Sequence, residues 1–345
     1  MLFSVCIPVY GAASFLERCL SSILQQEFHD YELILVDDGS MDESARLCQE
    51  FALRYPQILA IHGQNAGPAA ARNSAIECAS GDYLLFVDAD DEVMPDYFKV
   101  FAEAIQRNPS PLYWFGCLHD DGIHKVVKTS PAAFLNGQDE ILDFLEFQFC
   151  KSLKSWNKVL PYSNCCDTHS SWNKVISRQL IGQDKRFPAG TVVEEDLRFN
   201  LKLLERTTTL YVLPEILYCY NQQVAGSVTT KYNPVKFESK LAAYHDEKGF
   251  AERMSRPEIL NFFQDSLLSY VSSCTNNLCY SSCPLSTRQK LTEIRRFFIE
   301  PDVQDAVREC RPRSHRTRIM RWLISHRLVF LCWLIHFLGQ LFKKH

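Results

Sequence analysis

Three features are missing from this 345-residue sequence, and each absence excludes a class of function. Lys and Arg do not outnumber Asp and Glu (37 against 41, net charge -4), whereas a general nucleic-acid binder normally shows a basic surface. No Gly-x-Gly-x-x-Gly follows the first predicted strand, so a dinucleotide oxidoreductase is poorly supported. The apolar run at 328–342 is shorter than the ~20 residues that a membrane-spanning helix needs.

Paired cysteines and a secretory signal are also missing. The 14 cysteines are scattered, and the N-terminus enters the apolar run 3–7 directly, so we expect reduced thiols in a cytosolic compartment. Cys274, Cys279 and Cys283 match no usual zinc spacing, which favours buried thiols over a metal site. What is present is an ordinary globular composition, 46% hydrophobic and 23% charged, long enough for one large domain or two smaller ones.

The segment 83–91 organises the rest of the chain. A short run rich in Leu, Phe and Val predicts a strand buried on both faces, and Asp88, Asp90 and Asp91 follow it. Such a strand would deliver these carboxylates to the sheet rim, where open α/β sheets bind ligands. Adjacent carboxylates repel one another unless a cation neutralises them, which favours a divalent metal site. A solvated acidic turn is the alternative, and the segment alone does not decide.

The N-terminal third alternates predicted strands and helices. Strands are expected at 3–9, 31–36 and 58–62, with helices between them, and this order predicts βαβ units and a parallel sheet of the α/β class. The second strand ends in Asp37 and Asp38. Parallel strands end at one edge, so both acidic clusters should face one crevice, which favours a nucleotide and metal site.

Residues 65–73 lie between the two acidic clusters. Gly67 and Pro68 predict a turn, and Arg72 sits one turn into the following helix. The forked donors of Arg72 could bind a phosphate or hold an aspartate of the cluster in a salt bridge, and both roles stay open.

These segments together resemble a known family. Segments 7–10, 36–40, 65–73 and 87–91 follow the order and spacing of glycosyltransferase family 2. The resemblance implies a GT-A fold with a mixed, mostly parallel sheet flanked by helices, acting on a nucleotide-activated sugar. It also implies a donor site that holds Mn2+ or Mg2+. Its implied nucleotide-sugar contacts are Pro8, Val9, Tyr10 near the base, Asp38 at the base edge, Asp37, Arg72 and Asp88, with Asp88 and Asp90 on the metal. Asp91 stays open as the alternative to Asp90 for the direct metal ligand, and we choose Asp90.

The second half of the chain contributes the catalytic candidates. Glu195-Asp196 resembles the Glu-Asp motif of the family, in which the Asp is the base that deprotonates the acceptor hydroxyl during inverting transfer. We assign Asp196 to that role and Glu195 as second candidate; complementing a helix dipole is the ordinary alternative. Trp172 matches an acceptor-side position, with core packing as its default role. Its pentapeptide also occurs at 155–159.

The last predictions concern two short strands, one departure from the family pattern, a lid and the tail. Short strands are expected at 210–213 and 216–220, followed by Asn221 where the family often has Arg, and Gly226 suits a mobile lid. Basic residues from Arg308 onward lead into Trp, Leu and Phe, which favours a helix lying on an anionic membrane over one docked on protein.

The predicted organisation is a catalytic domain at 1–230, with a nucleotide-binding half (1–111) and an acceptor half (112–230), and a helical extension at 231–345. The predicted function is inverting, metal-dependent transfer of a hexose or N-acetylhexosamine from a UDP-sugar to a hydroxyl of a glycan or lipid-linked saccharide. The setting is surface-polysaccharide synthesis, at the inner face of the cell membrane and without nucleic acid. A homo-oligomer stays open. A non-catalytic nucleotide-sugar-binding or scaffold subunit is the alternative.

Overall fold

The computed structural model describes residues 1–150, 168–184, 186–188, 190, 193–222 and 232–342. The chain divides into two compact units, Met1–Val224 and Ala225–His345. The predicted boundary between residues 230 and 231 lies among residues that the structure does not describe.

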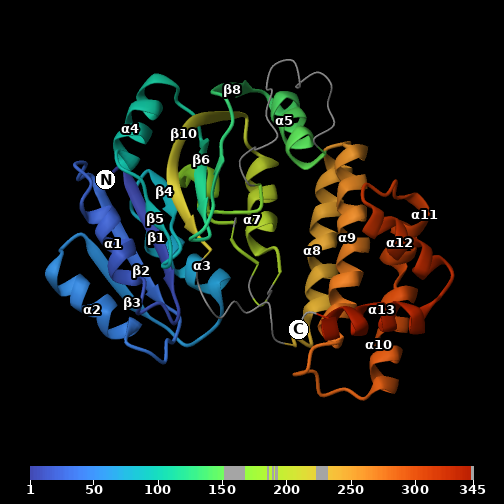
Figure 1. The fold of residues 1–345 in the computed structure, drawn as a ribbon. Coiled ribbons are helices and arrows are strands. Elements are labelled where there is room, and N and C mark those ends of the chain that lie inside the picture. The colour runs from blue at the N-terminus through green and yellow to red at the C-terminus, as the bar shows by residue number, and fades with distance from the viewer. Residues whose placement is uncertain (151–167, 185, 189, 191–192, 223–231, 343–345) are drawn as a thin grey trace. The chain divides into compact units, whose positions relative to one another are not determined.

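Unit 1 is a mixed α/β structure with helices on both faces of one sheet (Figure 1). Its order is β3-β2-β1-β4-β9-β6-β10-β5, with β7 paired to β6 and β8 paired to β10. The strands are β1 (Phe3–Val9), β2 (Tyr31–Asp37), β3 (Ile58–His62), β4 (Tyr83–Phe86), β5 (Glu92–Val93), β6 (Leu112–Asp120), β7 (Lys125–Lys128), β8 (Ala133–Asn136), β9 (Lys174–Ser177) and β10 (Thr209–Asn221). The helices are α1 (Leu16–Leu24), α2 (Ser44–Arg54), α3 (Pro68–Cys78), α4 (Tyr97–Arg107), α5 (Gln138–Cys150), α6 (Arg178–Ile181) and α7 (Glu195–Leu204).

The first four strands pair as predicted. β1 lies between β2 and β4, and β2 also pairs with β3, all in parallel. Both faces of β1 are covered, which explains why its sequence is a continuous apolar run instead of an alternating one. In the second half of the sheet only β6 and β10 are parallel, and β5, β7, β8 and β9 pair antiparallel. Parallel pairing therefore dominates the N-terminal half only.

The prediction of two short strands at 210–213 and 216–220 is wrong. A single strand, β10, covers both, and its pairing with β6 shifts register between Val212 and Ile216 and again before Tyr218. Pro214 lies in the first irregularity. Proline lacks the N–H that a ladder needs, so it is tolerated where the ladder is locally disrupted, and the strand continues beyond it.

An aromatic core anchors the N-terminal strands against α4. Phe98 of α4 stacks on Tyr31 and on Phe3, with ring centroids 4.5 and 5.6 Å apart, and all three side chains are buried. Burying such a ring stabilises a fold by about 1.5–3 kcal/mol, so these strands form a firm support for the loops at their carboxyl ends.

Unit 2 is helical throughout its described part. Its helices are α8 (Lys236–Arg253), α9 (Pro257–Leu278), α10 (Thr287–Ile299), α11 (Pro301–Glu309), α12 (His315–Ser325) and α13 (Val329–Phe342). Lys240 and Glu247 of α8 form a fully buried ion pair, 3.0 Å between Nζ and Oε1. Among the residues described, no helix combines the length and the apolar character that crossing a membrane requires.

Candidate active site

The carboxyl ends of β1, β2 and β4 meet at one edge of the sheet. Val9 and Asp37, which end β1 and β2, are partners in the parallel ladder, and the Asp38 N–H donates to the Val9 carbonyl at 2.8 Å. Asp88 follows β4, which pairs with β1 on its other side. The predicted convergence of the two acidic clusters is therefore a consequence of parallel pairing.

Asp38 joins this edge to the start of α3. Its two carboxylate oxygens each accept a backbone N–H, from Ala66 and from Gly67, both at 2.8 Å. The turn approaches so closely that a Cβ on Gly39, whose φ is +74°, would lie 2.8 Å from the Asn65 nitrogen. Only glycine fits there, which gives the Asp-Asp-Gly-Ser segment a structural reason. Any contact from Asp38 to a base would use the remaining lone pairs.

Asp37, which precedes Asp38, contacts the turn at the end of β2 and the neighbouring strand β3. Its Oδ1 accepts the Ser40 N–H at 3.3 Å, and its Oδ2 lies 3.6 Å from Nδ1 of His62 on β3. Asp37 is buried. It shapes the turn at the end of β2, and its predicted contact with the nucleotide sugar stays a prediction.

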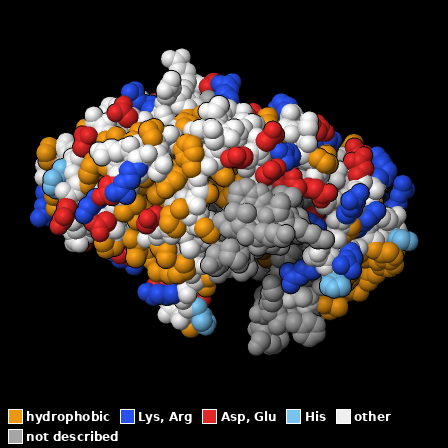
Figure 2. Space-filling model, turned by 90° about the horizontal axis from the view of Figure 1, so that it is seen from above, with side chains coloured by type: hydrophobic (Ala, Val, Ile, Leu, Met, Phe, Trp, Pro, Cys, Tyr) orange, Lys and Arg blue, Asp and Glu red, His pale blue; other side chains and the backbone are white. Residues whose placement is uncertain are grey.

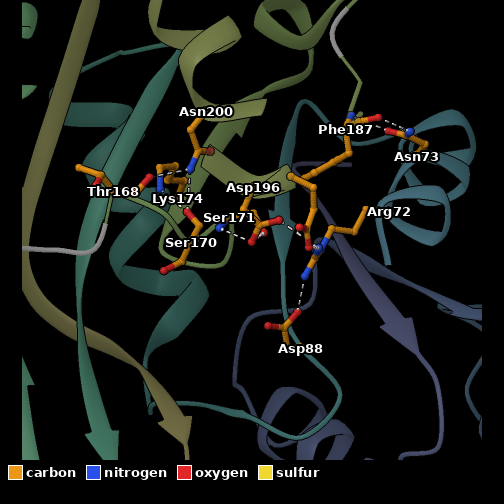
Figure 3. Close-up of polar contacts among 11 residues, drawn as sticks. Arg72, Asn73, Asp88, Thr168, Ser170, Ser171, Lys174, Phe187, Asp196 and Asn200 are labelled. Atoms are coloured by element: carbon orange, nitrogen blue, oxygen red, sulfur yellow. Dashed lines mark hydrogen bonds and ion pairs between the residues drawn. The ribbon is translucent and has the colours of Figure 1, made fainter. Parts of the chain in front are cut away.

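Arg72 of α3 is the centre of the site (Figure 3). One guanidinium nitrogen, Nη2, lies 2.9 Å from Oδ1 of Asp88, and the other, Nη1, lies 3.0 Å from Oδ1 of Asp196. Nη1 is also 3.6 Å from the Glu195 carboxylate. A single fork therefore joins the acidic turn after β4 to the acidic start of α7, 124 residues away from Arg72.

The charges of this group are strongly coupled. Burial opposes the positive charge of Arg72, but the carboxylates of Asp196, Asp88 and Glu195 outweigh it and raise the pKa of the guanidinium. Burial also raises the pKa of Asp196, while Arg72 works in the opposite direction. The pKa of Glu195 is raised by burial and then by the charge of Asp196. Arg72 thus holds together carboxylates that would otherwise repel one another.

Asp196 is held from a second side by the loop before β9. Its Oδ2 accepts both the backbone N–H and the hydroxyl of Ser171, at 3.1 and 3.0 Å (Figure 3). Its side chain remains 17% exposed, so an incoming hydroxyl can reach it. A partly buried carboxylate with a raised pKa and a fixed orientation has the properties of a general base.

The loop that carries Ser171 is itself fixed by buried polar side chains. Asn200 of α7 donates to the carbonyls of Thr168 and Ser170, both at 3.0 Å. Lys174, at the start of β9, is completely buried, donates to the Ser170 carbonyl and to Asn173, and lies 4.4 Å from the Trp114 ring centroid. The Trp-Asn-Lys segment thus supports the loop that positions Asp196.

Arg72 is also held in position by neighbouring residues, Asn73 and Phe187. Neighbouring Asn73 makes two hydrogen bonds of 2.9 Å with the backbone N–H and carbonyl of Phe187 (Figure 3). The Phe187 ring lies 5.4 Å from the Arg72 guanidinium carbon and stacks on Phe199 of α7. Sequence reasoning gave no individual role to Ser171, Lys174, Phe187 or Asn200; the repeated Ser-Trp-Asn-Lys-Val, which includes Ser171 and Lys174, was the one available signal.

The carboxylates in the acidic turn after β4 differ in burial and in hydrogen-bond partners. Asp91 is fully buried and accepts the Tyr218 hydroxyl at 2.8 Å and the Asn221 N–H at 2.7 Å. Burial and the nearby Asp88 raise the pKa of Asp91 to about 9. The amide of Asn221 also donates to the Asp90 carbonyl at 3.1 Å, so this departure from the family pattern helps hold the turn. Asp91 is a structural residue.

Asp88 and Asp90 suit a divalent cation better. Burial and the charge of Asp88 raise the pKa of Asp90, and in the described part of the chain no other residue donates a hydrogen bond to the Asp90 carboxylate. No group of three or more His, Cys, Asp or Glu that could hold a metal occurs among the described residues. Mg2+ sites commonly combine one or two carboxylates with substrate phosphates, which two aspartates satisfy.

The remaining predicted site residues differ in accessibility. Tyr10, just beyond β1, is 59% exposed and free to stack on a ligand, whereas Val9 is buried and Pro8 partly buried. Trp172 is only 5% exposed and stacks on Tyr218 at 4.5 Å between centroids. The second pentapeptide copy at 155–159 and the predicted lid at Gly226 lie outside the described residues.

The N-terminal part of the chain is similar to a known protein family. Residues 4–130 match the model of glycosyl transferase family 2. The N-terminal part of the chain therefore carries a segment similar to members of this family. EpsJ of Bacillus subtilis, an uncharacterized glycosyltransferase, is similar to this chain over almost its whole length, with 28% identity covering 99% of this chain and 95% of EpsJ.

Solved structures extend the likeness to the whole fold. Residues 1–349 of TarS from S. aureus, crystallised with UDP-GlcNAc, superpose with a TM-score of 0.65 at 18% identity, covering 98% of this chain and 89% of TarS. The mannosyltransferase PcManGT from Pyrobaculum calidifontis, in complex with GDP-Man and Mn2+, gives a TM-score of 0.51 at 12% identity, covering 97% and 86%. The predicted GT-A fold with a helical C-terminal region is confirmed.

Proposed function

We propose that this chain is a glycosyltransferase that moves a sugar from a UDP-sugar to an acceptor hydroxyl, with inversion at the anomeric carbon. The observation that carries the proposal is the pair of contacts made by the Arg72 guanidinium. It contacts both the candidate base Asp196 and Asp88 in the acidic turn after β4. Leaving group and base must flank one anomeric carbon in a single displacement, and this arrangement supplies both sides. UDP-GlcNAc in TarS supports a UDP-linked hexosamine or hexose as donor.

The donor would lie along the carboxyl ends of β1, β2 and β4. Tyr10 offers an exposed ring for the base, with Pro8 and Val9 beneath it, and Asp38 offers remaining lone pairs to the base edge. Asp88 and Asp90 would hold Mn2+ or Mg2+, which would offset the negative charge that develops on the departing diphosphate. Mn2+ in PcManGT is consistent with this assignment.

Asp196 performs the proton transfer in this mechanism. Its Oδ1 has one donor, Arg72, and keeps a lone pair for the acceptor proton, while Ser171 occupies Oδ2. As the acceptor oxygen bonds to the anomeric carbon, the bond from that carbon to the diphosphate breaks and the proton moves to Asp196. Glu195 is the second candidate for this role.

The acceptor proposed is a saccharide hydroxyl of a growing surface polysaccharide, free or lipid-linked. α12 and α13 expose apolar side chains next to a series of arginines, which supports peripheral attachment to an anionic membrane at its cytoplasmic face. Trp172 is proposed to act on the acceptor side through the residues it packs against, since little of its surface is exposed.

The test is nucleotide-sugar turnover with and without Mn2+, for the wild type, Asp196→Asn and Glu195→Gln. Loss of a general base costs about 10²–10⁴ in rate, so Asp196→Asn should lose turnover by that factor and keep its UDP affinity, measured by calorimetry. Glu195→Gln serves as the matched neighbour and should retain most activity. A fully active Asp196→Asn protein contradicts the mechanism. Nucleotide binding without turnover in the wild type favours the non-catalytic scaffold.

A further inference from the structure

Unit 2 contains a groove that the transfer reaction does not use. It has a volume of about 440 Å³ and lies among α9, α12 and α13. Ligand pockets usually measure about 300–1,000 Å³, so the groove can hold a headgroup-sized molecule. Its lining residues are Ser269, Ser272, Ser273, Asn276, Arg316, Ile319, Met320, Leu323, Ile335 and His336.

One wall of the groove is polar. Ser269, Ser272 or Ser273, and Asn276 recur at helical spacing, so α9 presents a stripe of hydroxyl and amide groups. Two of these groups each accept one hydrogen bond: the Ser273 hydroxyl accepts from Lys236 at 2.9 Å, and the Asn276 carbonyl oxygen accepts from Gln340 at 2.7 Å. The O–H of Ser273 and the amide N–H groups of Asn276 can donate to a ligand.

His336 of α13 determines the direction of the hydrogen bond made by the Ser272 hydroxyl. Nδ1 of His336 lies 2.8 Å from the Cys332 carbonyl, which can only accept, so this nitrogen carries the proton. Nε2 then accepts the Ser272 hydroxyl at 2.7 Å. Burial lowers the pKa of His336, which favours the neutral ring. His336 thus anchors the polar wall and adds no charge.

The opposite wall combines one positive charge with apolar surface. Arg316, Ile319, Met320 and Leu323 recur at helical spacing along α12. No Asp or Glu lines the groove, and within the described residues Arg316 has no carboxylate partner. Ile319 and Ile335 are about half exposed at the groove. Donors, a positive charge and apolar residues together match an anion joined to a hydrocarbon.

The surroundings of the groove continue this amphipathic character. α12 and α13 expose the large apolar side chains Ile319, Trp322, Phe330, Leu331, Ile335, Phe337 and Leu338. Figure 2 shows Lys and Arg side chains beside hydrophobic ones at the right-hand end of the face drawn, the end where Figure 1 places α11 and α12. Basic residues beside large apolar ones are typical of helices that lie in the headgroup region of a membrane.

We propose that this groove binds the phosphate of an anionic phospholipid headgroup, with Arg316 and the donors of α9 on the phosphate and the apolar wall of α12 against the start of the acyl chains. The inference rests on the membrane attachment in the proposed function. It goes beyond that attachment because it assigns a specific lipid-binding site, whereas general attraction between basic residues and anionic lipids needs none.

The test uses the full chain in flotation with vesicles of phosphatidylglycerol and phosphatidylcholine, against vesicles of phosphatidylcholine alone. Arg316→Gln is compared with Arg318→Gln, an exposed arginine of the same helix that does not line the groove. Removing one surface charge weakens binding by about five-fold, and losing a charge-assisted hydrogen bond adds about ten-fold or more. We therefore expect Arg316→Gln to weaken vesicle binding at least about ten-fold more than Arg318→Gln.

Two further measurements complete the test. Ser273→Ala, which changes no charge, should weaken binding several-fold, and soluble glycerol phosphate should compete only weakly because it lacks the hydrocarbon. Equal effects of the two arginine variants overturn the site but leave membrane attachment intact. Absence of binding to anionic vesicles overturns both, and strong competition by glycerol phosphate overturns the lipid assignment. Flotation is done without nucleotide sugar, so its outcome is independent of the transferase mechanism.

Discussion

Among the described residues, Arg72 is the only cation that forms ion pairs with Asp88, Asp196 and Glu195. Replacing Arg72 by Gln removes its charge. The guanidinium is almost fully buried, at 6% side-chain exposure, and the three carboxylates are 25%, 17% and 20% exposed. Gln keeps a comparable length but brings no charge. The variant therefore leaves three partly buried carboxylates facing one another without compensation.

The expected cost follows from this burial. Removing one partner of a buried ion pair typically destabilises a protein by about 3–5 kcal/mol, because the other charge stays buried and unpaired. The matched control is Arg107→Gln at the end of α4: Arg107 is 74% exposed and pairs with Glu103 at 2.9 Å. An exposed pair on one helix is worth about 0.3–0.5 kcal/mol. The two variants should thus differ by about 3 kcal/mol or more.

The cost should also depend on pH. Burial raises the pKa values of Asp196 and Glu195, and Arg72 counteracts the rise, so the variant should raise both pKa values further. A folded state with raised carboxyl pKa values binds more protons than the unfolded chain, so its stability falls as pH increases through the folded pKa. The loss in free energy of unfolding caused by Arg72→Gln should therefore be smallest in acid and grow toward neutral pH.

Urea unfolding at several pH values measures both effects. The fluorescence of Trp114 and Trp172, buried in unit 1, reports the relevant transition. A deficit for Arg72→Gln within about 1 kcal/mol of that for Arg107→Gln would refute the reasoning. So would a deficit that becomes larger as the pH is lowered.

Four further outcomes are expected. Tyr10→Ala should weaken UDP binding about ten-fold in calorimetry, since stacking a base on an aromatic ring is worth about 1–3 kcal/mol; unchanged affinity would remove Tyr10 from the base site. Asp90→Asn should raise the Mn2+ concentration needed for half-maximal turnover, whereas an unchanged metal titration would exclude Asp90 as a ligand. Ser171→Ala should lower kcat more than it changes KM and shift the acid limb of the pH–rate profile upward, because a donor to the Asp196 carboxylate is lost; an unmoved limb would count against Asp196 as the base. Asp91→Asn should preserve the metal titration while lowering stability, because its partners Tyr218 and Asn221 lie in the interior.

The fold of the N-terminal half could be predicted because its signals are local. Apolar runs such as Phe3–Val9, each followed by turn residues and a helical pattern, specify parallel strands without reference to distant segments. The second half was harder. β10 combines a proline and two register shifts, and its partners β5, β6 and β8 come from scattered places in the chain. Pairings of this kind depend on tertiary packing, so local patterns divided one strand into two.

The site divides in the same way. Sequence alone determined the acidic strand ends, the glycine turn after Asp38 and the position of Arg72, because short motifs carry their own geometry. Only the tertiary structure decided that Arg72 reaches Asp196 as well as Asp88, and that Ser171, held by Lys174 and Asn200, completes the setting of the base. It also separated Asp91, buried against Tyr218, from Asp90. Carboxylates adjacent in sequence acquire different roles through burial and partners, and those are properties of the folded chain.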